Sequence, residues 1–185
     1  LVAATVLFLW PIRSAELINW DDLDQIVRNP DMNPPRLSRM IAYVRGPYVG
    51  SLYPVSYWFL GGISAIARRG ETFNPHVFHV ASLVLHVIAV LLVLGLLREI
   101  FDSFWPAWVG AALFALHPVQ VESVAWISER KNVLMAFFYL LAALASVKFV
   151  AGKHKDEIKF YLLALVCFLL ALFSKTTACT LPIAL

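Results

Sequence analysis

Long apolar segments constrain this chain more than any other feature of its sequence. The stretch NPHVFHVASLVLHVIAVLLVLGLLRE gives about 20 apolar positions up to Leu97, enough to cross a hydrocarbon core of about 30 Å. Its Asn-Pro pair is a helix-start signal. Further apolar runs occupy residues 1–12, 133–150 and 160–173, and a shorter run from residue 107 is interrupted at Pro118. The pattern predicts an all-α integral membrane protein with about five spans.

Composition supports the membrane prediction and excludes other classes. Of 185 residues, 61% are hydrophobic and 15% are charged, whereas soluble domains are typically about 45–50% apolar and about 25% charged. That much apolar surface cannot be hidden in one soluble core of this length. The basic residues are scattered along the chain, so no nucleic-acid-binding stripe is predicted.

Residues 13–76 form a segment far longer than the usual connection of about 4–6 residues. Its later part, YVGSLYPVSYWFLGGISAIARRG, is aromatic and apolar but broken by Gly and Pro, which favours interfacial or re-entrant helices. The turns at residues 98–106 and 152–159 fall on the other side of the membrane. Because Lys and Arg in short loops favour the cytoplasm, we expect residues 13–76 to be the first extracytoplasmic loop, on the same face as residues 117–132 and Lys175.

The stretch INWDDLDQIVRNPD places Asp21, Asp22 and Asp24 beside Trp20. In a helix Asp21 and Asp24 share a face, and in an extended chain Asp22 and Asp24 do. Crowded carboxylates raise one another's pKa, as a general base requires. The alternative is a helix N-cap or a solvated acidic loop. Trp20 is either an aromatic platform for a sugar or peptide, or an interface anchor.

The stretch HPVQVESVAWISERKN carries His117, Glu122, Arg130 and Lys131 close to two spans. Charges so near a span need partners or water. The guanidinium of Arg130 offers two parallel N–H donors, and the ammonium of Lys131 offers a compact positive charge. Together these two groups could bind a phosphate. Lys175, at the end of a later span, could meet the same phosphate. The alternative for all three cations is snorkelling to the interface.

The remaining His and Cys residues do not predict a metal site. His79 and His86 are seven residues apart on one predicted helix, a spacing more typical of interhelical hydrogen bonds than of metal ligands. Cys167 and Cys179 lie in apolar surroundings and are expected to be packed small hydrophobes, not a disulfide. No phosphate-binding glycine loop, dinucleotide motif or nucleophile elbow is present in the sequence.

The order of the motifs resembles one family. NWDDLDQIVRNP, LYPVSYWFL, NPHVFHVASLVLH, ALHPVQVESVAWISERKN and LALFSKTTACTLP follow one another as in the transmembrane and TPR-repeat glycosyltransferases, the TMTC-type O-mannosyltransferases and their bacterial relatives. The resemblance implies a GT-C-like polytopic helical bundle. It also implies a polyprenyl-phosphate-sugar donor at the outer leaflet and a protein or glycan hydroxyl as acceptor.

The resemblance further implies roles for single residues. Asp21 and Asp22 match the family's acidic pair, of which one would deprotonate the acceptor while the other orients it or helps to bind the donor. Arg130, Lys131 and Lys175 would bind the donor phosphate, with His117 and Glu122 as supporting polar groups. Asp24 is not part of the recognised pair. Assistance by a divalent metal is left open, and the transferred sugar is expected to be mannose or another hexose.

Both ends suggest that residues 1–185 are a piece of one larger membrane domain. The chain begins at Leu1 inside an apolar run and stops inside another, and TPR repeats are expected only in the parent protein. We expect the site to face the periplasm from a bacterial inner membrane, or the lumen from an endoplasmic reticulum membrane. Two alternatives are a transporter or flippase for a lipid-linked sugar, and a non-catalytic membrane anchor of a TPR scaffold.

Overall fold

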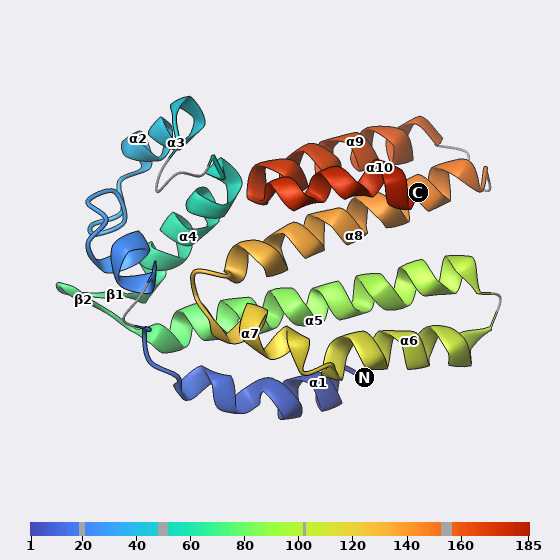
Figure 1. Ribbon diagram of the computed structural model, residues 1–185, viewed down its shortest axis with the longest axis horizontal. Helices are drawn as coiled ribbons and strands as arrows, with labels where there is room; N and C mark the ends of the chain where they lie inside the picture. Colours follow the sequence, from blue (N-terminus) through green and yellow to red (C-terminus); the bar gives the residue numbers. More distant parts are fainter. Residues whose placement is uncertain (19–20, 48–51, 102, 153–156) are drawn as a thin grey trace.

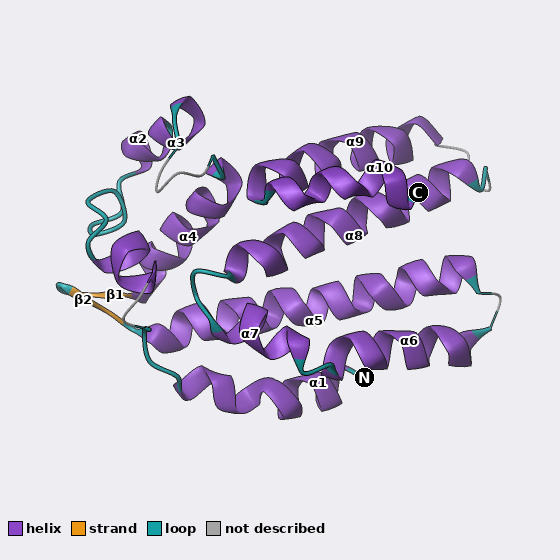
Figure 2. Cartoon of the chain, viewed as in Figure 1, coloured by secondary structure: helices purple, strands orange, loops and turns teal. Residues whose placement is uncertain are grey.

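The computed structural model describes residues 1–18, 21–47, 52–101, 103–152 and 157–185. The described chain is helical apart from loops and one short antiparallel hairpin, β1 (Arg68–Arg69) and β2 (Thr72–Phe73) (Figure 2). Trp20 and the charged turn residues 153–156 lie outside the described residues.

Three helices of the described chain are long and apolar enough to cross a membrane. They are α5 (Pro75–Ile100), α8 (Arg130–Val150) and α9 (Glu157–Ser174). The predicted runs at residues 1–12 and 107–117 form shorter helices, α1 (Val2–Leu9) continued by η1 (Trp10–Ser14), and α6 (Phe104–Leu116). The prediction of an all-helical integral membrane protein is therefore confirmed.

Local sequence explains where the longest helix begins. The side chain of Asn74 accepts a hydrogen bond from the backbone N–H of His76 at 3.2 Å, and Pro75 occupies the first helical position. The Asn74 N-cap satisfies one of the backbone N–H groups that have no partner in the first helical turn, and Pro75 has no N–H to satisfy there. The Asn-Pro signal thus starts α5 at the predicted residue.

The long helices pack in two antiparallel pairs, α5 with α6 and α8 with α9, and α5 also packs on α8 (Figure 1). Small residues allow the close approach. Ala107, Ala111 and Ala115 are fully buried at helical spacing on α6, and an ideal Cβ at Gly110 would lie 2.6 Å from Leu97 Cδ1. Small residues at helix contacts are typical of membrane bundles, because packing rather than water drives association there.

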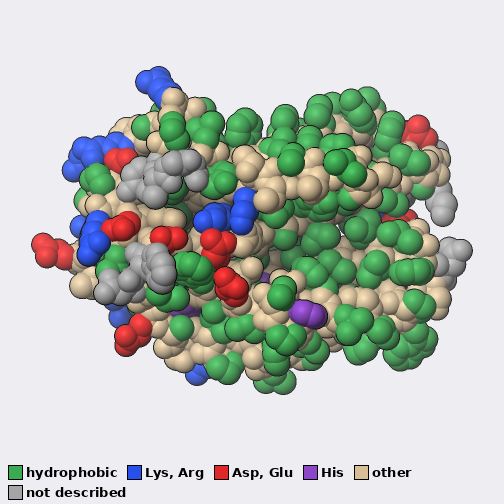
Figure 3. Space-filling view, viewed as in Figure 1, with side chains coloured by type: hydrophobic (Ala, Val, Ile, Leu, Met, Phe, Trp, Pro, Cys, Tyr) green, Lys and Arg blue, Asp and Glu red, His purple; other side chains and the backbone are tan. Residues whose placement is uncertain are grey.

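The segment between η1 and α5 forms a cap at one end of the bundle. We call this segment the cap: η2 (Leu23–Val27), α2 (Leu37–Met40), α3 (Ala42–Arg45), α4 (Pro54–Ala67) and the hairpin. Its core includes Tyr43 stacked on Tyr57, with ring centroids 4.5 Å apart. The last turns of α5 and α8 and the first turns of α6 and α9 lie at the opposite end (Figure 1). Charged side chains gather over the cap, and hydrophobic ones cover the long helices (Figure 3).

Candidate functional site

Asp22 joins the cap to the turn that precedes α8. The residue is 0% exposed. Its Oδ1 accepts hydrogen bonds from the backbone N–H of Ser128 at 2.9 Å and from the Ser128 hydroxyl at 2.5 Å, while Oδ2 accepts from the backbone N–H of Ile18 at 3.1 Å. Three donors thus satisfy the hydrogen-bonding needs of this buried carboxylate. Asp22 therefore holds together two segments that are 106 residues apart in the sequence.

Asp21, its neighbour, has a different environment. It is half-buried and lines a cavity of about 130 Å³ between η2, α4 and the start of α8. Within the part of the chain that the structure describes, its carboxylate has no hydrogen-bond or ion-pair partner. Because η2 continues a helical turn, Gln25 at i+4 lines the same cavity. Asp21 is thus the carboxylate with room for a substrate.

Arg130, the first residue of α8, extends into the same cavity. It is 3% exposed, donates from Nη2 to the carbonyl of Ile127 at 3.2 Å, and lies over the Phe78 ring at 5.2 Å from the centroid. Its Nη1 is buried without a hydrogen-bond partner among the described residues. A buried cation with an unsatisfied donor is costly unless an anion completes it.

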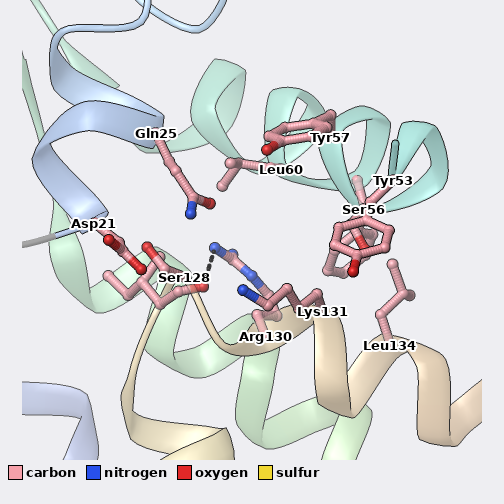
Figure 4. Close-up of a pocket in the computed structure, with 12 residues that line it drawn as sticks. Asp21, Gln25, Tyr53, Ser56, Tyr57, Leu60, Ser128, Arg130, Lys131 and Leu134 are labelled. Atoms are coloured by element: carbon pink, nitrogen blue, oxygen red, sulfur yellow. Dashed lines mark hydrogen bonds between the residues drawn. The ribbon is translucent and has the colours of Figure 1, made fainter. Parts of the chain in front are cut away.

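The close-up shows how these groups face one another. Asp21, Gln25 and Ser128 lie on one side of the cavity, Tyr53, Ser56 and Leu134 on the other, and the Arg130 guanidinium extends between them (Figure 4). The cavity therefore combines the Asp21 carboxylate with a buried cation that has one unused donor, Nη1, and whose charge is in part balanced by the nearby buried carboxylate of Asp22. The other lining residues are Tyr57, Phe59, Leu60, Ile127 and Lys131.

Lys131 and Lys175 both contact Glu129. Lys131 Nζ lies 2.9 Å from Glu129 Oε1, and Lys175 Nζ lies 3.7 Å from Glu129 Oε2. Lys175 also donates to Asn132 Oδ1, and Asn132 donates from Nδ2 to Glu129 at 2.5 Å. Lys131 lines the cavity, whereas Lys175 is not among its lining residues. The three predicted cations thus lie at one end of the bundle, with Lys175 beside the cavity.

The sequence is similar to that of a known protein family over most of its length. The model of the dolichyl-phosphate-mannose-protein mannosyltransferase family matches residues 49–185. The chain belongs to this family. The family resemblance inferred from the order of the motifs is thereby confirmed.

Curated relatives of this mannosyltransferase family are also similar to the chain. Protein O-mannosyl-transferase F38B6.6 of Caenorhabditis elegans is 36% identical over 180 residues, covering 90% of this chain and 24% of the relative. Protein O-mannosyl-transferase TMTC1 of Mus musculus is 31% identical over 131 residues, covering 68% of this chain and 14% of the relative. The chain therefore spans less than a quarter of these relatives. No solved structure is significantly similar to it.

His117 and Glu122 are not brought into the cavity of this family member. His117 is exposed beyond the end of α6, and its Nδ1 accepts from the backbone N–H of Val119 at 3.2 Å. Glu122 is exposed on α7 (Val119–Ala125). Asp24 is exposed and pairs with Arg28 at 2.8 Å, the arrangement of a solvated carboxylate. Neither His117 nor Glu122 is among the residues that line the cavity, and the supporting role expected of them stays a prediction.

The structure supports only part of what the sequence predicts for the histidines and cysteines: both ring nitrogens of the buried His79 lack a hydrogen-bond partner among the described residues, and Cys179 is exposed and not packed. His86 Nε2 lies 3.3 Å from the carbonyl of Ala115, so it makes a hydrogen bond between α5 and α6. Cys167 is buried and Cys179 exposed, and both are free. Within the described residues, no three His, Cys, Asp or Glu side chains are grouped so as to hold a metal ion.

Sequence reasoning missed Ser128. The residue sits in the polar turn SERKN, where serine is common and carries no spacing signal. Only the fold shows that both its N–H and its hydroxyl bind Asp22. Gln25, Tyr53 and Ser56 were missed for the same reason, because their meeting in one cavity depends on how the cap folds back.

We expect Ser128→Ala to destabilise the protein. The change leaves Asp22 buried with one hydrogen bond fewer, and a hydrogen bond to a charged group contributes about 1.5–3 kcal/mol. Thermal unfolding of the purified protein in detergent measures the loss. Ser38→Ala is the matched control, because Ser38 is exposed on α2; equal melting temperatures for the two variants would contradict the proposed contact.

Glu129 should make stability depend on pH. Burial raises the pKa of Glu129, but the hydrogen bond and charge of Lys131 and the charge of Lys175 outweigh it, so the pKa is lowered. A lowered pKa stabilises the fold above the unfolded value of about 4.3, and this contribution is lost as pH falls through the folded pKa. Glu129→Gln should therefore lower the melting temperature at pH 7 and have a smaller effect near pH 3.5. A pH-independent difference would contradict this origin.

Proposed function

We propose that this chain is part of a GT-C membrane glycosyltransferase that moves a hexose, mannose foremost, from a polyprenyl-phosphate donor to a hydroxyl of a protein or glycan. The observation that carries the proposal is the cavity that the Asp21 carboxylate and the Arg130 guanidinium line together, with Arg130 Nη1 unused as a donor among the described residues. One group can take a proton and the other can bind an anion. Family membership and relatives named protein O-mannosyl-transferases support this reading.

Asp21 acts as the general base. An acceptor hydroxyl is a weak nucleophile, and a carboxylate within hydrogen-bond reach removes its proton as attack proceeds. The acceptor oxygen bonds to the anomeric carbon while the bond from that carbon to the phosphate oxygen breaks. The phosphate leaves with the electron pair, and the proton stays on Asp21. Such a single displacement inverts the anomeric configuration.

Arg130 and Lys131 stabilise the leaving phosphate. Negative charge grows on the phosphate as the glycosidic bond breaks, so these cations stabilise the transition state more than the ground state. The Nη1 donor that Arg130 leaves unused suits a phosphate oxygen, and guanidinium–phosphate pairs are commonly bidentate. Lys175 acts indirectly. It contacts Glu129 and Asn132, and Glu129 forms the ion pair that holds Lys131 in place.

Asp22 is a positioning residue in this proposal. Its oxygens are already engaged by Ile18 and Ser128, and it is fully buried. It therefore neither takes the acceptor proton nor meets the donor. Its hydrogen bonds to Ser128 hold the turn that ends at Arg130, which places the cation opposite Asp21. In this proposal the two neighbours therefore differ: Asp21 acts on the acceptor, and Asp22 holds the turn that precedes Arg130.

The positions of the charges favour transfer over transport. A transporter should place its charged residues near the bilayer midplane on broken helices. Arg130 and Lys131 instead occupy the first turn of α8, and Lys175 directly follows the last turn of α9. We propose that this end faces the periplasm or the lumen. In the parent protein, further spans complete the same domain, and TPR repeats follow it.

The test uses the full-length parent protein in membrane vesicles. Radiolabelled mannose is supplied either as polyprenyl-phosphate mannose or as a nucleotide sugar, with a Ser/Thr-rich peptide as acceptor. We expect label in the peptide from the lipid donor alone. Transfer from the nucleotide sugar but not from the lipid would contradict the donor assignment. Movement of the lipid donor across the membrane, unchanged by Asp21→Asn and without transfer, would support a transporter instead.

A further inference from the structure

Helix α4 separates two cavities of opposite character. Tyr53, its N-cap, and then Ser56, Tyr57 and Leu60 line the cavity that contains Asp21 and Arg130. Trp58, Gly61, Gly62 and Ala65 line a second, apolar groove of about 400 Å³. Apart from Phe59, which also lines the first cavity, both sets follow the i, i+3, i+4, i+7 spacing of one helix face. The groove is therefore a separate feature of the cap, on another face of α4.

Helix α2 forms the opposite wall of the groove and is held close to α4. Trp58 Nε1 donates to the carbonyl of Met40 at 2.8 Å. An ideal Cβ at Gly61 would lie 2.9 Å from Met40 Sδ, so glycine allows this approach. A Cβ at Gly62 would meet nothing within 4 Å, which leaves the floor of the groove open.

A single cation lies among the residues that line the groove. The lining residues are Pro35, Arg36, Met40, Ile41, Trp58, Gly61, Gly62 and Ala65. Arg36, the N-cap residue of α2, forms no ion pair with any residue that the structure describes, whereas Arg39 within α2 pairs with Asp31 at 3.4 Å. An apolar trough with a cation at its edge complements an anionic lipid, which has an apolar chain and a negatively charged headgroup.

We propose that this groove binds an acyl chain of an anionic phospholipid of the bilayer, with the lipid phosphate on Arg36. The sugar donor is not its occupant, because the donor phosphate belongs with Arg130 in the cavity on the other face of α4. The bound lipid covers the exposed side of Trp58, which is 46% exposed in the bare chain. Excluding the sugar donor in this way rests on the proposed function, whereas the apolar lining of the groove and the position of Arg36 do not.

Trp58 is a natural probe for the test. The full-length protein is placed in phosphatidylcholine nanodiscs that contain a low fraction of dibrominated phosphatidylglycerol or, separately, the same fraction of dibrominated phosphatidylcholine. Bromine quenches tryptophan on contact, and the Trp58 signal is the difference between the unmutated protein and Trp58→Phe. One cation near a membrane surface favours an anionic lipid about fivefold. We therefore expect brominated phosphatidylglycerol to reach half-maximal quenching at about one fifth of the membrane fraction that brominated phosphatidylcholine requires.

Two variants and one competitor decide between occupants. Arg36→Gln should make both brominated lipids quench equally, and Gly62→Leu should remove the preference by filling the floor, while both variants keep the unmutated melting temperature. Arg28→Gln is the matched control, because Arg28 is exposed in the cap and does not line the groove. Equal quenching by both lipids in the unmutated protein, or displacement by added polyprenyl phosphate, would overturn the proposal.

Discussion

Asp21→Asn should abolish sugar transfer without unfolding the protein. The amide cannot accept the acceptor's proton, and loss of a positioned general base costs about 10²–10⁴-fold in rate. Stability should be unchanged, because the Asp21 carboxylate has no hydrogen-bond or ion-pair partner among the described residues. Turnover per folded molecule, with melting temperature measured on the same sample, checks both halves of the expectation.

Asp22→Asn is the matched control one position away. An amide there presents an N–H where Asp22 now accepts from either Ile18 or Ser128, and a lost hydrogen bond to a buried charge contributes about 1.5–3 kcal/mol. The melting temperature should fall clearly for Asp22→Asn and stay constant for Asp21→Asn. If Asp22→Asn abolished transfer at full stability while Asp21→Asn remained active, the two roles would be reversed.

Arg130→Gln should give the second large effect. Removing one preorganised donor to developing negative charge costs about 10²–10³-fold in rate, and we expect the loss to appear mainly in kcat. Arg130→Lys keeps the charge but loses the planar fork, so it should recover only part of the activity. Steady-state kinetics with varied polyprenyl-phosphate mannose make the measurement.

Lys131→Gln is the matched comparison for Arg130. Lys131 reaches the cavity from the next position of α8 but already pairs with Glu129 at 2.9 Å. Its loss should therefore reduce the rate less than Arg130→Gln does. Equal losses in the two variants would mean that the cations act as a diffuse charge, and the specific pairing of phosphate with the buried guanidinium would be contradicted.

Much of the fold could be predicted because it depends on local pattern. Hydropathy places α5, α8 and α9, and the Asn-Pro signal places the start of α5 at Pro75. The break at His117-Pro118 ends α6, where His117 is the C-cap residue. These features follow from the lipid requirement that each span satisfy its own backbone hydrogen bonds. They need no knowledge of which helices become neighbours.

The division of labour between Asp21 and Asp22 could not be predicted in the same way. Their types and spacing are equivalent, and the difference arises because the Ser128 turn folds against one of them. The same limit explains Lys175, which spacing could place at the correct end of the bundle but not against Glu129 and Asn132. Contacts between segments more than 40 residues apart decide these roles, and no local pattern records them.

His117 and Glu122 illustrate a prediction from motif order without geometric support. They follow α6 and lie on α7, and both are exposed outside the cavity. Cavity residues come instead from η2, α4 and the first turns of α8, because the cap folds back over the start of α8. His117 and Glu122 are close to Arg130 in the sequence but do not line the cavity that Arg130 lines.

The most direct test of the shared site is a structure of the full-length protein with polyprenyl phosphate bound. The account predicts that the phosphate lies within hydrogen-bond distance of Arg130 Nη1, on the same side of α4 as Asp21. A phosphate bound elsewhere, whether in the groove beside Arg36 or near His117 and Glu122, would contradict it.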